Sequence, residues 1–171
     1  MVMPLIQLYT THYNLSEVNF LLFQYYVFVC KKIYGTQIKP KYAGGAVEKI
    51  LFMNDDPVIL DVVGELIKAL GHEAEFSAHG KDDVEKYALA KHLGKPFNAV
   101  ILDITTRGEI GGAEAVRMLK EIDPGAMAIV SSGYSDNAIT SNYREYKFDA
   151  FLKKPYNVVI LRDVLGGVLN R

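Results

Sequence analysis

Three aspartates follow closely on apolar runs of the chain, and together they could form one acidic site. Asp55 and Asp56 come shortly after the run 50–53, and Asp103 ends the run 99–102. Runs without a polar residue are typical of buried parallel strands. Carboxylates that meet repel one another unless a cation lies among them, and an oxygen-only cluster favours a hard divalent ion. We therefore predict a Mg²⁺ site, with Mn²⁺ as a substitute ion, formed by these three carboxylates and the backbone carbonyl of Thr105.

A hydroxyl and an ammonium group stand at the ends of two later runs. Ser132 follows the run 126–131, and Lys154 follows the segment 150–153. Beside a metal ion, these groups would cradle a phosphoryl group, whose transfer depends mainly on positioning and on charge neutralisation. Asp103 would then be the nucleophile and would become an aspartyl-phosphate. Singly, each residue has an ordinary explanation as a cap, turn or surface position, so the prediction depends on their joint placement at strand ends.

From residue 46 onward, short apolar runs alternate with amphipathic stretches of helical period. The predicted strands are 49–53, 73–78, 99–103, 126–131 and 150–153, and the predicted helices are 57–70, 81–93, 113–122, 137–146 and 157–170. Connections of this length suit parallel strands with right-handed crossovers, which place helices on both faces of the sheet. The sequence therefore predicts a doubly wound α/β fold with its site at the carboxyl edge of the strands.

Composition excludes several classes of protein. The net charge of the 171 residues is −1, and no cluster of lysine or arginine recurs along a helix, which excludes direct binding of nucleic acid. The four histidines have no zinc-ligand spacing, and the single cysteine, Cys30, cannot form an internal disulfide. These features predict a cytoplasmic protein.

The segment 1–45 differs in composition from the rest of the chain. It holds six of the eleven tyrosines and, apart from Glu17, almost no acidic residue. Its apolar centre, 20–30, is interrupted by Gln24 and is shorter than the ~20 residues that span a bilayer. We predict an N-terminal extension and linker over 1–45, helical in part, before a domain over 46–171. Four roles stay open for it: a helix that packs on this domain, a helix that forms a homodimer, the end of a longer parent protein, and membrane contact through residues 18–32.

Four stretches together resemble the receiver domain of two-component response regulators. They are Phe52-Met53-Asn54-Asp55-Asp56, Val100-Ile101-Leu102-Asp103, Val130-Ser131-Ser132-Gly133-Tyr134 and Phe151-Leu152-Lys153-Lys154-Pro155-Tyr156. The resemblance covers 47–171, and within the family the stretches 105–112 and 131–135 are similar to the C-terminal receivers of hybrid sensor histidine kinases. It implies a flavodoxin-like (βα)5 fold with strand order 2-1-3-4-5.

The resemblance also implies an activity. A phosphohistidine on a histidine kinase or a histidine phosphotransfer protein would give its phosphoryl group to Asp103, in a reaction that needs the magnesium bound by Asp55 and Asp56. Ser132 and Lys154 would contact the phosphoryl oxygens, and the peptide before Pro155 would be cis. Such a domain is not a conventional enzyme, because it catalyses only its own phosphorylation and dephosphorylation.

In this family the phosphoryl group moves a switch, whose residues here would be Ser132 and Phe151. The surface formed by the fourth helix, the fifth strand and the fifth helix would change with them. Phe151 lacks the hydroxyl of the tyrosine that is frequent there, so its ring could stay inward in both states. Thr105 and Tyr134 each stand two residues beyond a motif residue, where they would set the lifetime of the aspartyl-phosphate.

Three other readings compete with a phosphoacceptor. One is a docking module that no longer accepts phosphate. A haloacid-dehalogenase-like phosphohydrolase would need a second acid two residues after Asp103, where Thr105 stands. A flavin or dinucleotide module would need a glycine-rich loop after the first strand, and that loop is acidic here.

Overall fold

The computed structural model describes residues 46–104, 111–133, 139 and 141–170. These residues belong to one compact unit of the chain. The predictions for the extension 1–45, for Thr105 and for Tyr134 lie outside the described residues. Within the described part, no helix combines the length and the apolar character that a membrane crossing requires.

Five strands form a single parallel sheet, as predicted. They are β1 (Lys49–Met53), β2 (Glu73–Ser77), β3 (Ala99–Asp103), β4 (Ala128–Ser132) and β5 (Ala150–Lys153). Their order is β2-β1-β3-β4-β5, which confirms the flavodoxin-like order. The pairs Met53 with Leu102 and Asp103 with Ser131 place the carboxyl ends of β1, β3 and β4 at one edge.

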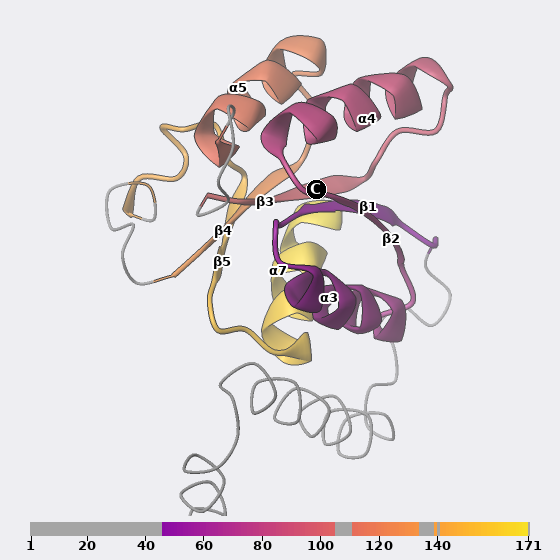
Figure 1. The fold of residues 1–171 in the computed structure, drawn as a ribbon, viewed down its shortest axis with the longest axis vertical. Helices are drawn as coiled ribbons and strands as arrows, with labels where there is room; N and C mark the ends of the chain where they lie inside the picture. Colours follow the sequence, from indigo (N-terminus) through magenta and orange to yellow (C-terminus); the bar gives the residue numbers. More distant parts are fainter. Residues whose placement is uncertain (1–45, 105–110, 134–138, 140, 171) are drawn as a thin grey trace, which may run out of the picture. The chain divides into compact units, whose positions relative to one another are not determined.

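The helices cover both faces of this sheet. They are α3 (Pro57–Ala69), α4 (Gly80–His92), α5 (Gly112–Ile122) and α7 (Val158–Leu169). Figure 1 shows α4 and α5 on one face and α3 and α7 on the other. Side chains cap two of the helices: Asp56 accepts a hydrogen bond from the Val58 amide at 2.9 Å, and Asn157 accepts from Val159 and Ile160. The doubly wound architecture is therefore confirmed.

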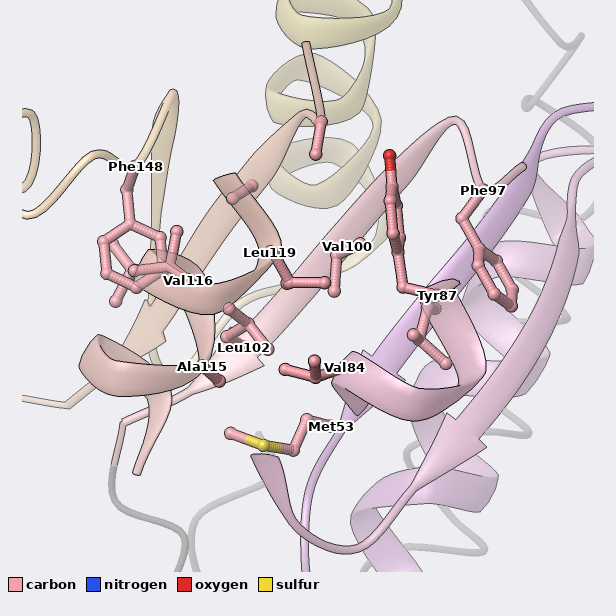
Figure 2. Packing of buried hydrophobic residues seen from close by; sticks show 14 of the residues in the cluster. Met53, Val84, Tyr87, Phe97, Val100, Leu102, Ala115, Val116, Leu119 and Phe148 are labelled. Carbon is pink, nitrogen blue, oxygen red and sulfur yellow. The ribbon is translucent and has the colours of Figure 1, made fainter. Parts of the chain in front are cut away.

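The core on the face of α4 and α5 fixes β3, the strand that carries Asp103. Every residue of β3 is buried. Val100 and Leu102 point toward the side chains of α4 and α5, including Val84 and Leu119 (Figure 2). Because alternate side chains of a strand face opposite sides, the other residues of β3 face α3 and α7. A strand packed on both faces gives Asp103 a rigid support.

Two predicted boundaries differ from the structure by more than one residue. β4 begins at Ala128 and not at residue 126, because residues 123–126 form a turn in which the Ala126 amide donates to the Asp123 carbonyl at 3.0 Å. The predicted helix 137–146 does not continue to its end. Residues 143–147 form turns with bonds between residues three apart, and Lys147 adopts a φ of 67°.

Candidate functional site

The carboxylate of Asp103 lies buried at the end of β3, where Lys154 and Asn54 are among the residues that hold it. Only 1% of the residue is exposed. Its Oδ2 lies 2.5 Å from Nζ of Lys154 and also accepts a hydrogen bond from Nδ2 of Asn54. A buried carboxylate needs such partners, because burial removes its hydration. The structure thus brings the predicted Asp103 and Lys154 together.

Asn54 is a site residue to which the sequence analysis gave no role. It directly follows β1 and is 1% exposed. Its Oδ1 accepts a hydrogen bond from the Asp56 amide at 2.8 Å, which turns Nδ2 toward Asp103. Its own backbone amide donates to the Ser77 carbonyl at 3.1 Å. The signal in the sequence was its place between an apolar run and two acids.

The two acids that follow Asn54 were predicted to hold a metal ion, and that role stays a prediction. Asp55 and Asp56 are both exposed. Asp56 uses Oδ1 to cap α3, whereas the side chain of Asp55 makes no hydrogen bond with the described residues. Among the residues that the structure describes, no group of three histidine, cysteine, aspartate or glutamate side chains is arranged to hold a metal ion. The amide of Asn54, and not an acid, therefore contacts Asp103 from this side.

Ser132 and Lys154 lie on neighbouring chain segments at the same edge. Ser132 ends β4 and is fully buried, and its carbonyl accepts the Lys154 amide at 2.8 Å. Its hydroxyl donates to the Gly133 carbonyl at 3.3 Å. The peptide between Lys154 and Pro155 is cis, which confirms that prediction. These contacts tie the ends of β4 and β5 to the carboxylate of Asp103.

The face of the sheet that carries α3 adjoins this site through Lys154. An apolar cavity of about 420 Å³ is lined by Lys154, Pro155 and Tyr156 together with four aliphatic residues of α3. The hydroxyls of Tyr156 and Ser131 are buried without a hydrogen-bond partner among the described residues. Burial is the main cause that raises the pKa of Tyr156, and the charge of Asp103 adds to it. Tyr156 is therefore neutral beside the charged site.

Phe151, the predicted switch residue, lies on β5. It is partly buried and packs against the core on the face of α4 and α5. An inward ring is one of the two positions expected from the sequence. Its movement stays a prediction.

Comparisons with a family model, with curated proteins and with solved structures all indicate one family. The family model described as response regulator receiver domain matches residues 50–165. The chemotaxis protein CheY of Thermotoga maritima is 30% identical over 122 residues, which are 71% of this chain and 97% of CheY.

One further curated protein and one solved structure are also similar to this chain. A cyclic di-GMP phosphodiesterase of Thermotoga maritima is 26% identical over 113 residues, 66% of this chain, and the match spans 28% of that protein. The receiver domain of a sensor histidine kinase from Pseudomonas aeruginosa, described with magnesium in its active site cleft, has a TM-score of 0.65 at 19% identity and covers 74% of this chain and 100% of that one. This chain therefore belongs to the response regulator receiver domains, which are modules of two-component signalling systems.

Proposed function

We propose that the chain accepts a phosphoryl group on Asp103 from a phosphohistidine of a histidine kinase or histidine phosphotransfer protein. The observation that carries this proposal is the buried Asp103 carboxylate held by Lys154 and Asn54 at the carboxyl edge of the sheet. A carboxylate oxygen would attack phosphorus as the bond from phosphorus to the imidazole nitrogen breaks. The imidazole nitrogen leaves with the bonding electron pair. A ring that carries a proton on its other nitrogen leaves as neutral imidazole, and a ring without that proton takes one from solvent.

The residues around Asp103 supply charge and hydrogen bonds for this transfer. The ammonium of Lys154 would neutralise a phosphoryl oxygen, and the hydroxyl of Ser132, at the end of the adjacent strand, would donate to another. Dephosphorylation is the attack of water on phosphorus, with release of inorganic phosphate and return of the free carboxylate. Thr105 and Tyr134 are proposed to control the access of that water.

A magnesium ion is part of the proposal, because the available donors are hard carboxylate oxygens. Asp55 and Asp103, with the carbonyl of Thr105, would hold it, and Asp56 would contribute only the oxygen that it does not use to cap α3. When bound, the ion would supply positive charge to the phosphoryl oxygens. The exposed side chain of Asp55, which bonds to no described residue, supports its role as the main acidic ligand.

The two neighbouring acids are expected to differ when each is replaced. Asp55→Asn should weaken Mg²⁺ binding roughly tenfold, about 1.4 kcal/mol, because it removes a charged ligand. Asp56→Ser should weaken it much less, by about twofold at most, because one oxygen of Asp56 is already used by the cap and serine keeps that cap. Isothermal titration with Mg²⁺ measures both, and thermal unfolding checks the cap. Equal losses in the two variants would contradict the assignment of Asp55.

The switch is proposed to connect Asp103 to the surface formed by β5, α7 and the segment before β5. Phe151→Ala is expected to leave labelling of Asp103 by acetyl phosphate nearly unchanged while it alters partner binding, because the ring packs on the core and not on the carboxylate. Labelling is followed by intact mass, and binding by titration of the phosphorylated chain with the partner. Equal loss of both would show that the ring serves only the core.

One observation favours a second function, which is docking without phosphorylation. Among the described residues, no group of three acidic, histidine or cysteine side chains around Asp103 is arranged to hold a metal ion. The side-chain amide of Asn54 contacts the Asp103 carboxylate instead. Incubation of the wild-type chain with acetyl phosphate and Mg²⁺ decides between the two. Transfer of one phosphoryl group supports the phosphoacceptor, and its absence, together with no binding of beryllofluoride, supports the docking module.

A further inference from the structure

A second buried carboxyl group, Asp83, lies outside the site described so far. It stands in the first turn of α4 and is 0% exposed. Its Oδ1 accepts a hydrogen bond from the Ser77 hydroxyl, at the end of β2. Its Oδ2 is buried without a hydrogen-bond partner among the described residues. A carboxylate in such a place lacks a counter-charge, so the neutral acid is the form that burial favours.

The groups around Asp83 also favour its neutral form. The pKa of Asp83 is raised from 3.8 to about 7. Burial is the largest cause and Asp82 adds to it, whereas the Ser77 hydroxyl and Lys86 act in the opposite direction. The ammonium of Lys86 donates a hydrogen bond to the Phe76 carbonyl, and Lys86 forms no ion pair with Asp83. Both charged groups that act on Asp83 therefore come from α4 itself, and β2 contributes only the neutral hydroxyl.

Three hydrogen bonds connect Asp83 to the phosphoacceptor. The Ser77 hydroxyl donates to Asp83, and the Ser77 carbonyl accepts the backbone amide of Asn54 at 3.1 Å. The side-chain amide of Asn54 in turn donates to Asp103. Asp83 and Asp103, on different elements, are thus separated by only two residues. The connection is contiguous, so a change at one end can reach the other through Ser77.

We propose that Asp83 is a positioning residue for Asp103, and that its protonation state sets how firmly Ser77 and Asn54 hold the phosphoacceptor. The neutral acid stays between α4 and β2 and keeps the Ser77 hydroxyl in place. The ionised form accepts more strongly from the Ser77 hydroxyl and gains hydration by moving toward solvent and Lys86, so it draws Ser77 with it and loosens the hold of the Asn54 amide on Asp103. The role in phosphotransfer rests on the proposed function, whereas the link from Asp83 to Asn54 does not.

Nuclear magnetic resonance of the full chain tests this link without a phosphodonor. The side-chain amide signal of Asn54 is followed from about pH 5.5 to about pH 8.5. In the wild-type chain it is expected to shift with a midpoint at about 7, and in Asp83→Asn this step should be lost. Ser77→Ala, which breaks the connection and keeps the acid, should lose it too. Ser77→Ala also decides the test if Asp83→Asn fails to fold.

A histidine close to Asp83 provides the control. His79 is the N-cap residue of α4 and makes no side-chain capping bond. Because histidine also titrates in this range, His79→Gln must keep the step if Asp83 causes it. The inference is overturned by an Asn54 signal without a step, by a step that persists in Asp83→Asn or in Ser77→Ala, or by a step that disappears in His79→Gln.

The consequence for phosphotransfer is measured separately. Labelling by acetyl phosphate is expected to fall with rising pH more steeply in the wild-type chain than in Asp83→Asn. Parallel profiles would restrict Asp83 to positioning Asn54 and overturn its role in the reaction. A chain that accepts no phosphoryl group would instead contradict the proposed function, and the Asn54 signal would still decide the link.

Discussion

Asp103→Asn is expected to abolish phosphorylation of the chain. Acetyl phosphate and Mg²⁺ should transfer one phosphoryl group to the wild-type carboxylate with release of acetate, and the amide cannot act as that nucleophile. The loss should be complete, because Asp103 is a buried carboxylate held by the ammonium of Lys154 and the amide of Asn54. Intact mass measures the transfer, and the acyl-phosphate bond is identified by its cleavage with hydroxylamine.

A matched control comes from an aspartate that lies away from the site. Asp163→Asn changes an exposed residue of α7 that pairs with Arg162 at 2.8 Å, and it should be labelled as fully as the wild-type chain. Label that persists in Asp103→Asn, on any residue, would contradict the assignment of the phosphoacceptor. Thermal unfolding of both variants shows whether a loss of label reflects chemistry or a loss of fold.

The sequence was sufficient to predict the strands, because most of them are short apolar runs and β2, with glutamates at Glu73 and Glu75, alternates between polar and apolar residues. The order of the strands came from the family resemblance, since the pattern of one chain does not say which strands pair. The start of β4 and the turns over 143–147 could not be predicted in the same way. Both depend on local hydrogen bonds between residues three apart, which compete with strand and helix on nearly equal terms.

Asp103 and Lys154 were predictable as a pair because parallel strands bring their carboxyl ends to one edge. The cap that Asp56 forms on α3 was predictable, because an acid directly before a proline is typical of a helix start. The contact between Asn54 and Asp103 was not predictable, because side-chain direction is lost as a guide where a strand ends and a helix begins. There Asp56 turns back to cap α3, and Asn54 turns toward Asp103. Which residue of such a run faces the site depends on the capping geometry and not on spacing alone.

Asp83 shows a different limit of prediction. The helical period predicts that Val84, Tyr87 and Ala88 face inward; the first two are buried and Ala88 is half-buried. Asp83 is buried with them, although an acid beside another acid is usually an exposed position. Its position is explained only by the Ser77 hydroxyl on β2, a contact between elements that local periodicity cannot reveal.

Raising the pH from about 4 to about 7 is expected to reduce the stability of the folded chain by about 3 kcal/mol through Asp83 alone. Over this interval the unfolded chain has lost the Asp83 proton, and the folded chain keeps it, because burial raises the pKa from 3.8 to about 7. The stabilisation is complete below the unfolded pKa, falls as pH rises, and is absent above the folded pKa. Urea unfolding of the wild-type chain and of Asp83→Asn at each pH measures it. The contributions of the other carboxylates cancel when the two free energies of unfolding are subtracted.

The partners of Asp83 allow a sharper form of this prediction. Ser77→Ala alone should destabilise the chain, because Oδ1 of Asp83 then loses its donor inside the core. Ser77→Ala combined with Asp83→Ala removes both polar groups together, so above the folded pKa this variant should be within about 1 kcal/mol of the wild-type chain or more stable. A difference between wild type and Asp83→Asn that stays flat or rises with pH would show that the folded state holds an ionised Asp83. In that case Lys86, and not Ser77, would be the partner that keeps the carboxylate in place.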